Sequence, residues 1–203
     1  MKKKLMSVII AAVMIFSGAV SVSAAAPDYS KWDSQAAYPR DVVNTPLFAP
    51  VKSLMDKKII EGYPDGLFRP EKGVTRTEFL KMILIATNND KDAGAYTQTK
   101  FPDAAGHWGA KYINKGVSMG LIKGMPDGTF APDAGVTYAQ AFAMFLRSRG
   151  ISDQEMRAYG EWPDNYAKYA NMYGMLGDVY VANWDFPASR GDIAKILYRN
   201  LPK

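Results

Sequence analysis

Two arginines occupy a helix position that suits an anionic ligand. Arg76 follows Thr75 and Arg190 follows Ser189, and in both places Thr or Ser is predicted to cap the N-terminus of a helix. The first N–H groups of a helix have no partner within it, and the helix dipole makes this end positive. A guanidinium there adds charge-assisted hydrogen bonds. We therefore expect both arginines to bind an anion; the alternative is a solvated side chain or a salt bridge.

The same helix start occurs three times, with an acidic or amide residue three positions after the cap. This spacing is that of a capping box, in which each side chain accepts a hydrogen bond from the other residue's backbone N–H. Capped helices are therefore expected over 75–86, 137–149 and 189–200. The cap residues expected near the site are Thr75, Glu78, Thr137, Gln140, Ser189 and Asp192.

An internal repeat underlies these three helix starts. A shift of 62 positions maps Asp41 onto Asp103, Gly62 onto Gly124 and Thr75 onto Thr137, together with a Pro-Asp-Gly turn. A third copy is more degenerate. It is recognised by a shift of 54 from Trp108 to Trp162, and it lacks the turn.

Each copy is predicted to fold as helix, loop and helix, which makes the fold class all-α. One such pair of helices cannot bury its apolar faces alone, whereas three can share a core. Glycines 62, 124 and 174 are expected to end the first helices in a left-handed conformation. The expected organisation is an N-terminal leader at 27–40, repeat 1 at 41–90, repeat 2 at 100–150 and a degenerate repeat 3 at 151–203.

The N-terminus resembles a secretory signal peptide. Lys2-Lys3-Lys4 precedes an apolar run from Leu5 to Val20 and then small residues, so residues 1–26 are assigned to it. The alternative is an uncleaved membrane anchor, but the run is short for a span of about 20 residues. No later segment is apolar enough to cross a membrane. We expect an exported chain that begins near residues 25–27.

Composition excludes several functions. The chain has 25 basic and 20 acidic residues, and three of the lysines lie in the predicted signal peptide, so the remainder lacks the excess basic charge of a nucleic-acid-binding protein. There is no cysteine and only one histidine, His107, so thiol chemistry and a multi-histidine metal site are excluded. We expect no enzymatic activity, cofactor or metal.

Beyond these arguments, the repeats resemble the S-layer homology (SLH) motif over essentially the whole exported chain, in three tandem copies. Val74-Thr75-Arg76-Thr77-Glu78-Phe79 is similar to the helix start that is the hallmark of the family. The second copy carries Phe101-Pro102-Asp103, His107-Trp108, Gly120-Leu121-Ile122-Lys123-Gly124, Pro126-Asp127-Gly128-Thr129-Phe130, Pro132 and Val136-Thr137 in the order of the motif.

The resemblance implies a pseudo-threefold arrangement within one chain, in which the capped helices form a central three-helix bundle. It also implies grooves between the lobes that bind the secondary cell-wall polysaccharide of Gram-positive-type bacteria, commonly through a pyruvylated N-acetylmannosamine. The expected location is outside the cell, in the cell wall or S-layer. The expected partners are this polysaccharide and a surface protein.

A pyruvyl group carries a carboxylate, which suits Arg76 and Arg190. Trp108 and Trp162 are expected to stack on a sugar or shape the groove wall, with core packing as the alternative. Gly62 and Gly124 would let the backbone approach the ligand. The ligand-binding set also includes the repeated aspartates Asp41 and Asp103.

Departures from the motif predict fewer than three equivalent sites. Tyr138 stands where the second copy should have arginine, and Thr45-Pro46 stands where the second copy has His107-Trp108. The competing hypotheses are a structural or adhesion protein that acts through protein contacts and, with less support, a small secreted hydrolase.

Overall fold

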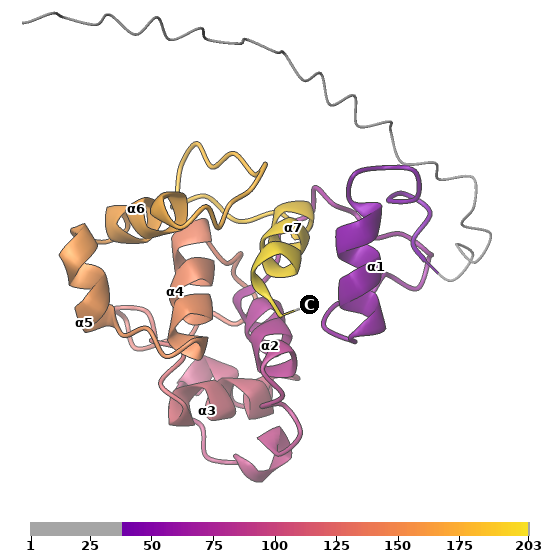
Figure 1. Cartoon of the computed structure of the whole chain (residues 1–203). Helices are drawn as coiled ribbons and strands as arrows, with labels where there is room; N and C mark the ends of the chain where they lie inside the picture. Colours follow the sequence, from indigo (N-terminus) through magenta and orange to yellow (C-terminus); the bar gives the residue numbers. More distant parts are fainter. Residues whose placement is uncertain (1–37, 203) are drawn as a thin grey trace, which may run out of the picture. The chain divides into compact units, whose positions relative to one another are not determined.

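The structure is a computed structural model that describes residues 38–202 (Figure 1). Within this range it is helical and contains no β-strand, which confirms the all-α prediction. None of the described helices is long and apolar enough to span a membrane. The predicted signal peptide and all of the leader before Tyr38 lie outside the described residues. The α-helices are α1 (Phe48–Asp56), α2 (Arg76–Ala86), α3 (Ala110–Ser118), α4 (Tyr138–Ser148), α5 (Asp153–Met156), α6 (Asp164–Met172) and α7 (Arg190–Asn200), and the 3-10 helices are η3 (Ala93–Ala95), η4 (Pro102–Ala104) and η5 (Arg157–Tyr159).

The capped helices α2, α4 and α7 begin where the sequence places them. In α2, Thr75 Oγ1 accepts from the Glu78 N–H at 3.1 Å, and Glu78 Oε2 accepts from the Thr75 N–H at 2.9 Å. Thr137 and Gln140 form the same pair of bonds at the start of α4. At α7 only Ser189 caps, because the Asp192 carboxylate accepts a hydrogen bond from the Tyr138 hydroxyl instead.

The N-terminus of each capped helix is bound to the chain segment that precedes another capped helix. Isolated β-bridges within the described residues join Thr75 to Gly135, Thr137 to Pro187, and Ser189 to Gly73. These three contacts link the first copy to the second, the second to the third, and the third back to the first. They form a closed ring, which agrees with a pseudo-threefold arrangement; that arrangement itself stays a prediction.

The helices pack between copies in the same cyclic order. Helix α2 packs on α3, α4 packs on α6, and α7 packs on α1, while α2 and α4 also contact each other. In Figure 1 the capped helices α2, α4 and α7 lie between the outer helices α1, α3 and α6. Their apolar faces meet in one core, to which each copy contributes, for example through Phe79, Phe142 and Ile193. Each first helix is thus covered by the capped helix of a different copy.

The prediction for the ends of the first helices was wrong at two of three glycines. The left-handed residues are Lys58, Gly120 and Gly174, with φ of 58°, 67° and 60°. Gly62 and Gly124 lie four residues later, outside the left-handed region, and the loop packs more tightly on Gly124 than on Gly62. A Cβ on Gly124 would come within 2.4 Å of Phe101 Cε1, and one on Gly62 within 3.0 Å of Pro39 Cγ.

Candidate functional site

Two hollows of the molecule are lined by corresponding residues of the repeat. We name them groove A, with a volume of about 460 Å³, and groove B, with about 200 Å³. Each combines the arginine at the start of one capped helix with the loop and capped helix of the next copy and a tryptophan of the copy after that. The shared positions are Arg76, Gly124, Gln140, Met144 and Trp162 in groove A, and Arg190, Gly62, Glu78, Met82 and Trp108 in groove B.

The two arginines make equivalent hydrogen bonds with the loops of neighbouring copies. Arg76 donates from Nε to the Phe130 carbonyl at 2.8 Å and from Nη2 to the Lys123 carbonyl at 3.2 Å. Arg190 donates in the same way to the equivalent carbonyls, Phe68 at 3.0 Å and Glu61 at 2.8 Å. Each guanidinium also lies 4.6 Å from the centre of the phenylalanine ring, a cation–π geometry. Loop and aromatic ring therefore fix each cation at the groove.

Both arginines are buried cations without a carboxylate partner among residues 38–202. Arg76 is 3% exposed and Arg190 is 6% exposed. Burial lowers the pKa of Arg76 to about 10, with the Asp103 charge opposing this shift, so the side chain stays charged at neutral pH. Burying a charged side chain costs on the order of several kcal/mol of free energy unless an opposite charge compensates for the lost hydration. The two grooves thus offer unneutralised positive charge to an anion.

The free backbone donors expected beside these arginines are absent in the described structure. The Arg76 N–H donates to Ala134 and the Thr77 N–H donates to Pro132, at 2.9 and 3.2 Å. In α7 the N–H groups of Arg190 and Gly191 are likewise taken up by carbonyls of the first copy. The prediction was wrong on this point because the ring of contacts between copies satisfies each helix N-terminus. An anion would meet the guanidinium, not the helix end.

The tryptophans are surface residues. Trp108 is 55% exposed and Trp162 is 50% exposed, so the alternative of core packing is wrong for both. Trp162 lies edge-on to Tyr166, with ring centres 5.3 Å apart, and Trp108 contacts Tyr112 in the same way at 6.4 Å. Each groove therefore has a large, accessible aromatic surface beside its buried cation.

The other residues predicted to belong to the site lie partly in the grooves and partly in the loops. Gly62 and Gly124 line the grooves, as do the cap residues Glu78 and Gln140. Asp41 and Asp103 line neither. The Asp41 carboxylate accepts from two backbone N–H groups, of Phe68 and Arg69, both at 2.7 Å, and Asp103 does the same for Phe130 and Ala131. The aspartates hold the loops that in turn hold the arginines. The caps Thr75, Thr137, Ser189 and Asp192 are outside both linings.

Comparison with known proteins identifies the repeats. The family model for the S-layer homology domain matches residues 40–80 and 100–142. These two segments are S-layer homology domains. The third copy, at 151–203, stays a prediction.

The relatives of the chain include proteins of the bacterial surface. It is 34% identical to a cellulosome-anchoring protein of Acetivibrio thermocellus over 60% of this chain and 28% of the relative, and 31% identical to a middle cell wall protein of Brevibacillus brevis over 72% and 14%. A cell surface protein of Thermoanaerobacter kivui is 28% identical over 98% of this chain and 24% of its own length. Some relatives are named as enzymes, such as an endoglucanase of a Bacillus strain. The chain spans less than a third of the length of these relatives. The anchoring, cell wall and cell surface proteins among them agree with the predicted cell-wall localisation.

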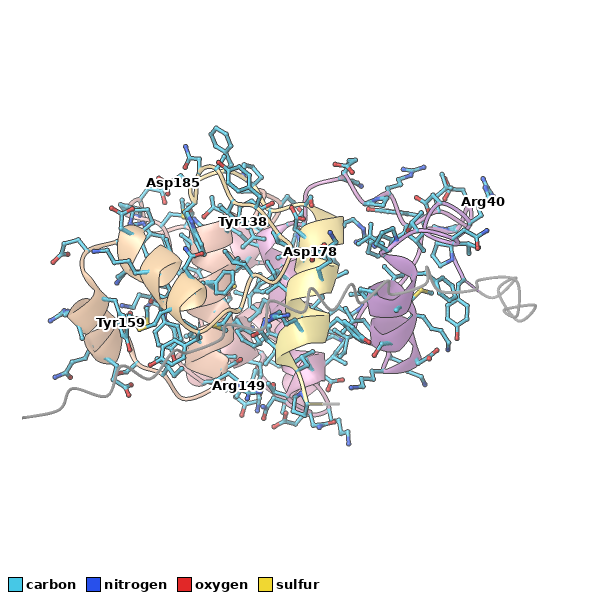
Figure 2. All side chains as sticks on the ribbon, turned by 45° about the horizontal axis from the view of Figure 1, so that its top comes forward. Arg40, Tyr138, Arg149, Tyr159, Asp178 and Asp185 are labelled. Atoms are coloured by element: carbon cyan, nitrogen blue, oxygen red, sulfur yellow. The ribbon has the colours of Figure 1, made fainter. Side chains whose placement is uncertain are left out.

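The third position of the closed ring differs from grooves A and B. Tyr138, labelled in Figure 2, replaces the arginine; its hydroxyl donates to Asp192, and burial raises its pKa to about 12. A hollow of about 610 Å³ lies between α1 and α7, where Pro46 takes the place of the tryptophan. Neither an N1 arginine nor a tryptophan lines it. Its chemistry is therefore different from that of the two grooves.

Sequence reasoning missed a polar cluster that lines groove A. The Asp153 carboxylate accepts from Arg147 Nε at 2.8 Å and Nη2 at 3.1 Å, from the Tyr166 hydroxyl at 3.1 Å, and from Lys123. It thereby joins the second-copy loop, α4, α5 and α6. The 62-residue shift pairs Arg147 with Ile85. This change from an apolar to a charged residue is the feature of the sequence that could have indicated the cluster.

Replacing Asp153 by Asn is expected to reduce stability at neutral pH and to matter less in acid. Burial opposes ionisation of Asp153, but its bonds to Arg147 and Lys123 outweigh burial and hold its pKa well below the usual range. A depressed folded-state pKa gives stability that is complete above the unfolded-state pKa of about 3.9 and is lost as the pH falls below it. Urea denaturation of both proteins at about pH 7 and about pH 2.5 measures this difference. A destabilisation of equal size at both pH values would contradict the assignment.

Proposed function

We propose that this chain is a non-catalytic module that holds a protein at the bacterial surface by binding cell-wall polysaccharide in grooves A and B. The observation that carries the proposal is the recurrence, in both grooves, of a buried arginine without a carboxylate beside a half-exposed tryptophan. A cation alone would suit any anion. Together with an aromatic face it suits an acidic sugar, because a sugar ring presents apolar C–H groups as well as hydroxyls.

The ligand that fits best is a pyruvylated N-acetylmannosamine at the end of the polysaccharide. Its carboxylate would accept from the guanidinium of Arg76 or Arg190, which is already oriented by two loop carbonyls. Its ring would lie against Trp162 or Trp108. Because the arginine is oriented before the ligand binds, less side-chain conformational entropy is lost on binding. The relatives of the chain, which include a cellulosome-anchoring protein and a middle cell wall protein, support the same role.

The proposal is tested by retention on purified cell walls. The chain from Ala25 onward is mixed with intact walls and with walls from which hydrofluoric acid has removed the polysaccharide. Only intact walls are expected to retain it. Replacing both Trp108 and Trp162 by Ala is expected to weaken retention at least about tenfold, since each aromatic contact contributes on the order of 1 kcal/mol. Both side chains are half exposed, so the variant should fold normally.

Tyr180→Ala is the matched control, because Tyr180 is 87% exposed and lines neither groove. Its retention is expected to equal that of the wild type. Equal retention by intact and stripped walls, with no effect of the tryptophan variant, would contradict the proposal. That outcome would favour a structural or adhesion protein that acts through protein contacts.

A further inference from the structure

Grooves A and B differ in size although their central residues correspond. Groove A, at about 460 Å³, falls within the range of roughly 300–1,000 Å³ that is usual for small-molecule sites, whereas groove B, at about 200 Å³, falls below it. Both contain the same arginine, glycine, methionine and tryptophan positions. The additional volume of groove A must come from other residues.

Several of these residues belong to the segment between α4 and Trp162. From helices α5 and η5 and the residues after them, Asp153, Arg157, Gly160 and Glu161 line groove A. The corresponding segment between α2 and Trp108 contributes nothing to groove B. Its 3-10 helix η3 packs on α3 instead, where Asp92 forms an ion pair with Lys115 at 2.8 Å. Groove A is therefore extended on one side by a structure that groove B lacks.

The extension is fixed in place. Ser152 and Glu155 form a capping box at the start of α5. Asp153, the next residue, is held by Arg147 of α4 and Tyr166 of α6. Figure 2 shows Tyr159 of η5 at the opposite side of the molecule from Arg40, so the extension lies at an edge of the described chain. A rigid wall of this kind is suited to binding without a large ordering cost.

The charges of the two grooves also differ. Two acidic residues of groove B, Glu61 and Glu78, correspond to Lys123 and Gln140 in groove A. The extension adds Asp153, Glu161 and Arg157 to groove A. Asp153 is paired with Lys123 and Arg147, whereas Arg157 is exposed and forms no ion pair among residues 38–202. Its two cations without a carboxylate partner among residues 38–202 are thus Arg76 of α2 and Arg157 of η5, which belong to separate elements of the chain. A ligand with two acidic groups could pair with both arginines, whereas a ligand with one acidic group could pair with only one of them.

We propose that groove A binds two consecutive units of an acidic glycan, the second with its acidic group at Arg157, whereas groove B binds a single unit. This inference rests on the proposed function, because it assigns the length of glycan that each groove takes. Arg157 is a specificity-determining residue for the second unit, and Asp153 is a positioning residue that holds the wall through Arg147. The two grooves therefore read different lengths of the same polymer.

The experiment isolates each groove and varies the length of the probe. Arg190→Gln leaves groove A intact, and Arg76→Gln leaves groove B intact. If an arginine variant does not fold, Trp108→Ala is used in place of Arg190→Gln, and Trp162→Ala in place of Arg76→Gln. The probes are the terminal monosaccharide and the terminal disaccharide released from the cell-wall polysaccharide, and binding is measured by calorimetry. With groove A alone, the disaccharide is expected to bind at least about tenfold more tightly than the monosaccharide, because one additional charge-assisted hydrogen bond changes affinity by about this factor.

With groove B alone, the two probes are expected to bind within about twofold of each other. Adding Arg157→Gln to the groove A protein should remove the gain from the second unit and leave monosaccharide binding unchanged. Arg149→Gln, at an exposed arginine outside the groove lining, should change neither.

Equal dependence on probe length in the two grooves, or a gain that persists in Arg157→Gln, would overturn this inference. Monosaccharide binding by the wild type would then still support the proposed function. If the wild type binds neither probe and intact walls do not retain it, the proposed function is overturned and this inference falls with it.

Discussion

Replacing both Arg76 and Arg190 by glutamine is expected to reduce retention on intact cell walls at least about a hundredfold. A hydrogen bond to a charged group contributes roughly 1.5–3 kcal/mol, and each 1.4 kcal/mol is a factor of ten in affinity. Each single variant should lose the corresponding groove only. Because two grooves on one chain reinforce each other on a polymer, the double variant should lose more than either single variant suggests. The measurement is the fraction retained at increasing wall concentration.

Two controls separate loss of binding from loss of folding. Arg76→Lys keeps a positive charge but cannot reproduce the paired donation to the Phe130 and Lys123 carbonyls, so it should retain part of the binding. Tyr138→Phe changes the equivalent position of the second copy, which lines neither groove, and should bind walls like the wild type. Far-ultraviolet circular dichroism establishes that each variant is helical. A folded double-glutamine variant with normal retention would refute the role of the arginines.

The local parts of the fold could be predicted from the sequence. The start of α2 is fixed by Thr75 and Glu78, which lie three residues apart and satisfy each other's backbone groups whatever surrounds them. The same holds at Thr137. Helix α5 was missed although Ser152 and Glu155 carry the same signal, because a helix of four residues is too short for an apolar period to be visible.

The surroundings of the arginines could not be predicted in this way. Arg76 binds carbonyls 54 and 47 residues away, and Arg190 binds carbonyls 122 and 129 residues away. These partners are backbone atoms, so no side-chain type at either position signals them. The sequence therefore predicted which residue carries the charge but wrongly left the helix N–H groups free. Only the closure of the ring between copies determines what each helix N-terminus meets.

Gly124→Ala is expected to destabilise the fold by about 2–3 kcal/mol, the upper part of the range for overpacking, whereas Gly62→Ala should cost less than about 1 kcal/mol. A Cβ on Gly124 would lie 2.4 Å from Phe101 Cε1 and 2.8 Å from the Thr129 carbonyl oxygen, and the buried ring and the backbone have no room to withdraw. On Gly62 the nearest atoms are 3.0 and 3.3 Å away, so a small shift suffices. Urea denaturation measures both free energies of unfolding.

The same comparison links the loops to the grooves. The Lys123 carbonyl that orients Arg76 directly precedes Gly124, so a displaced loop should weaken binding in groove A while groove B, held by the Glu61 carbonyl, keeps its affinity. Gly62→Ala should leave binding in both grooves close to that of the wild type. Equal destabilisation by the two substitutions would mean that both loops accommodate a Cβ equally well. The close packing of Gly124 on Phe101 would then not constrain groove A.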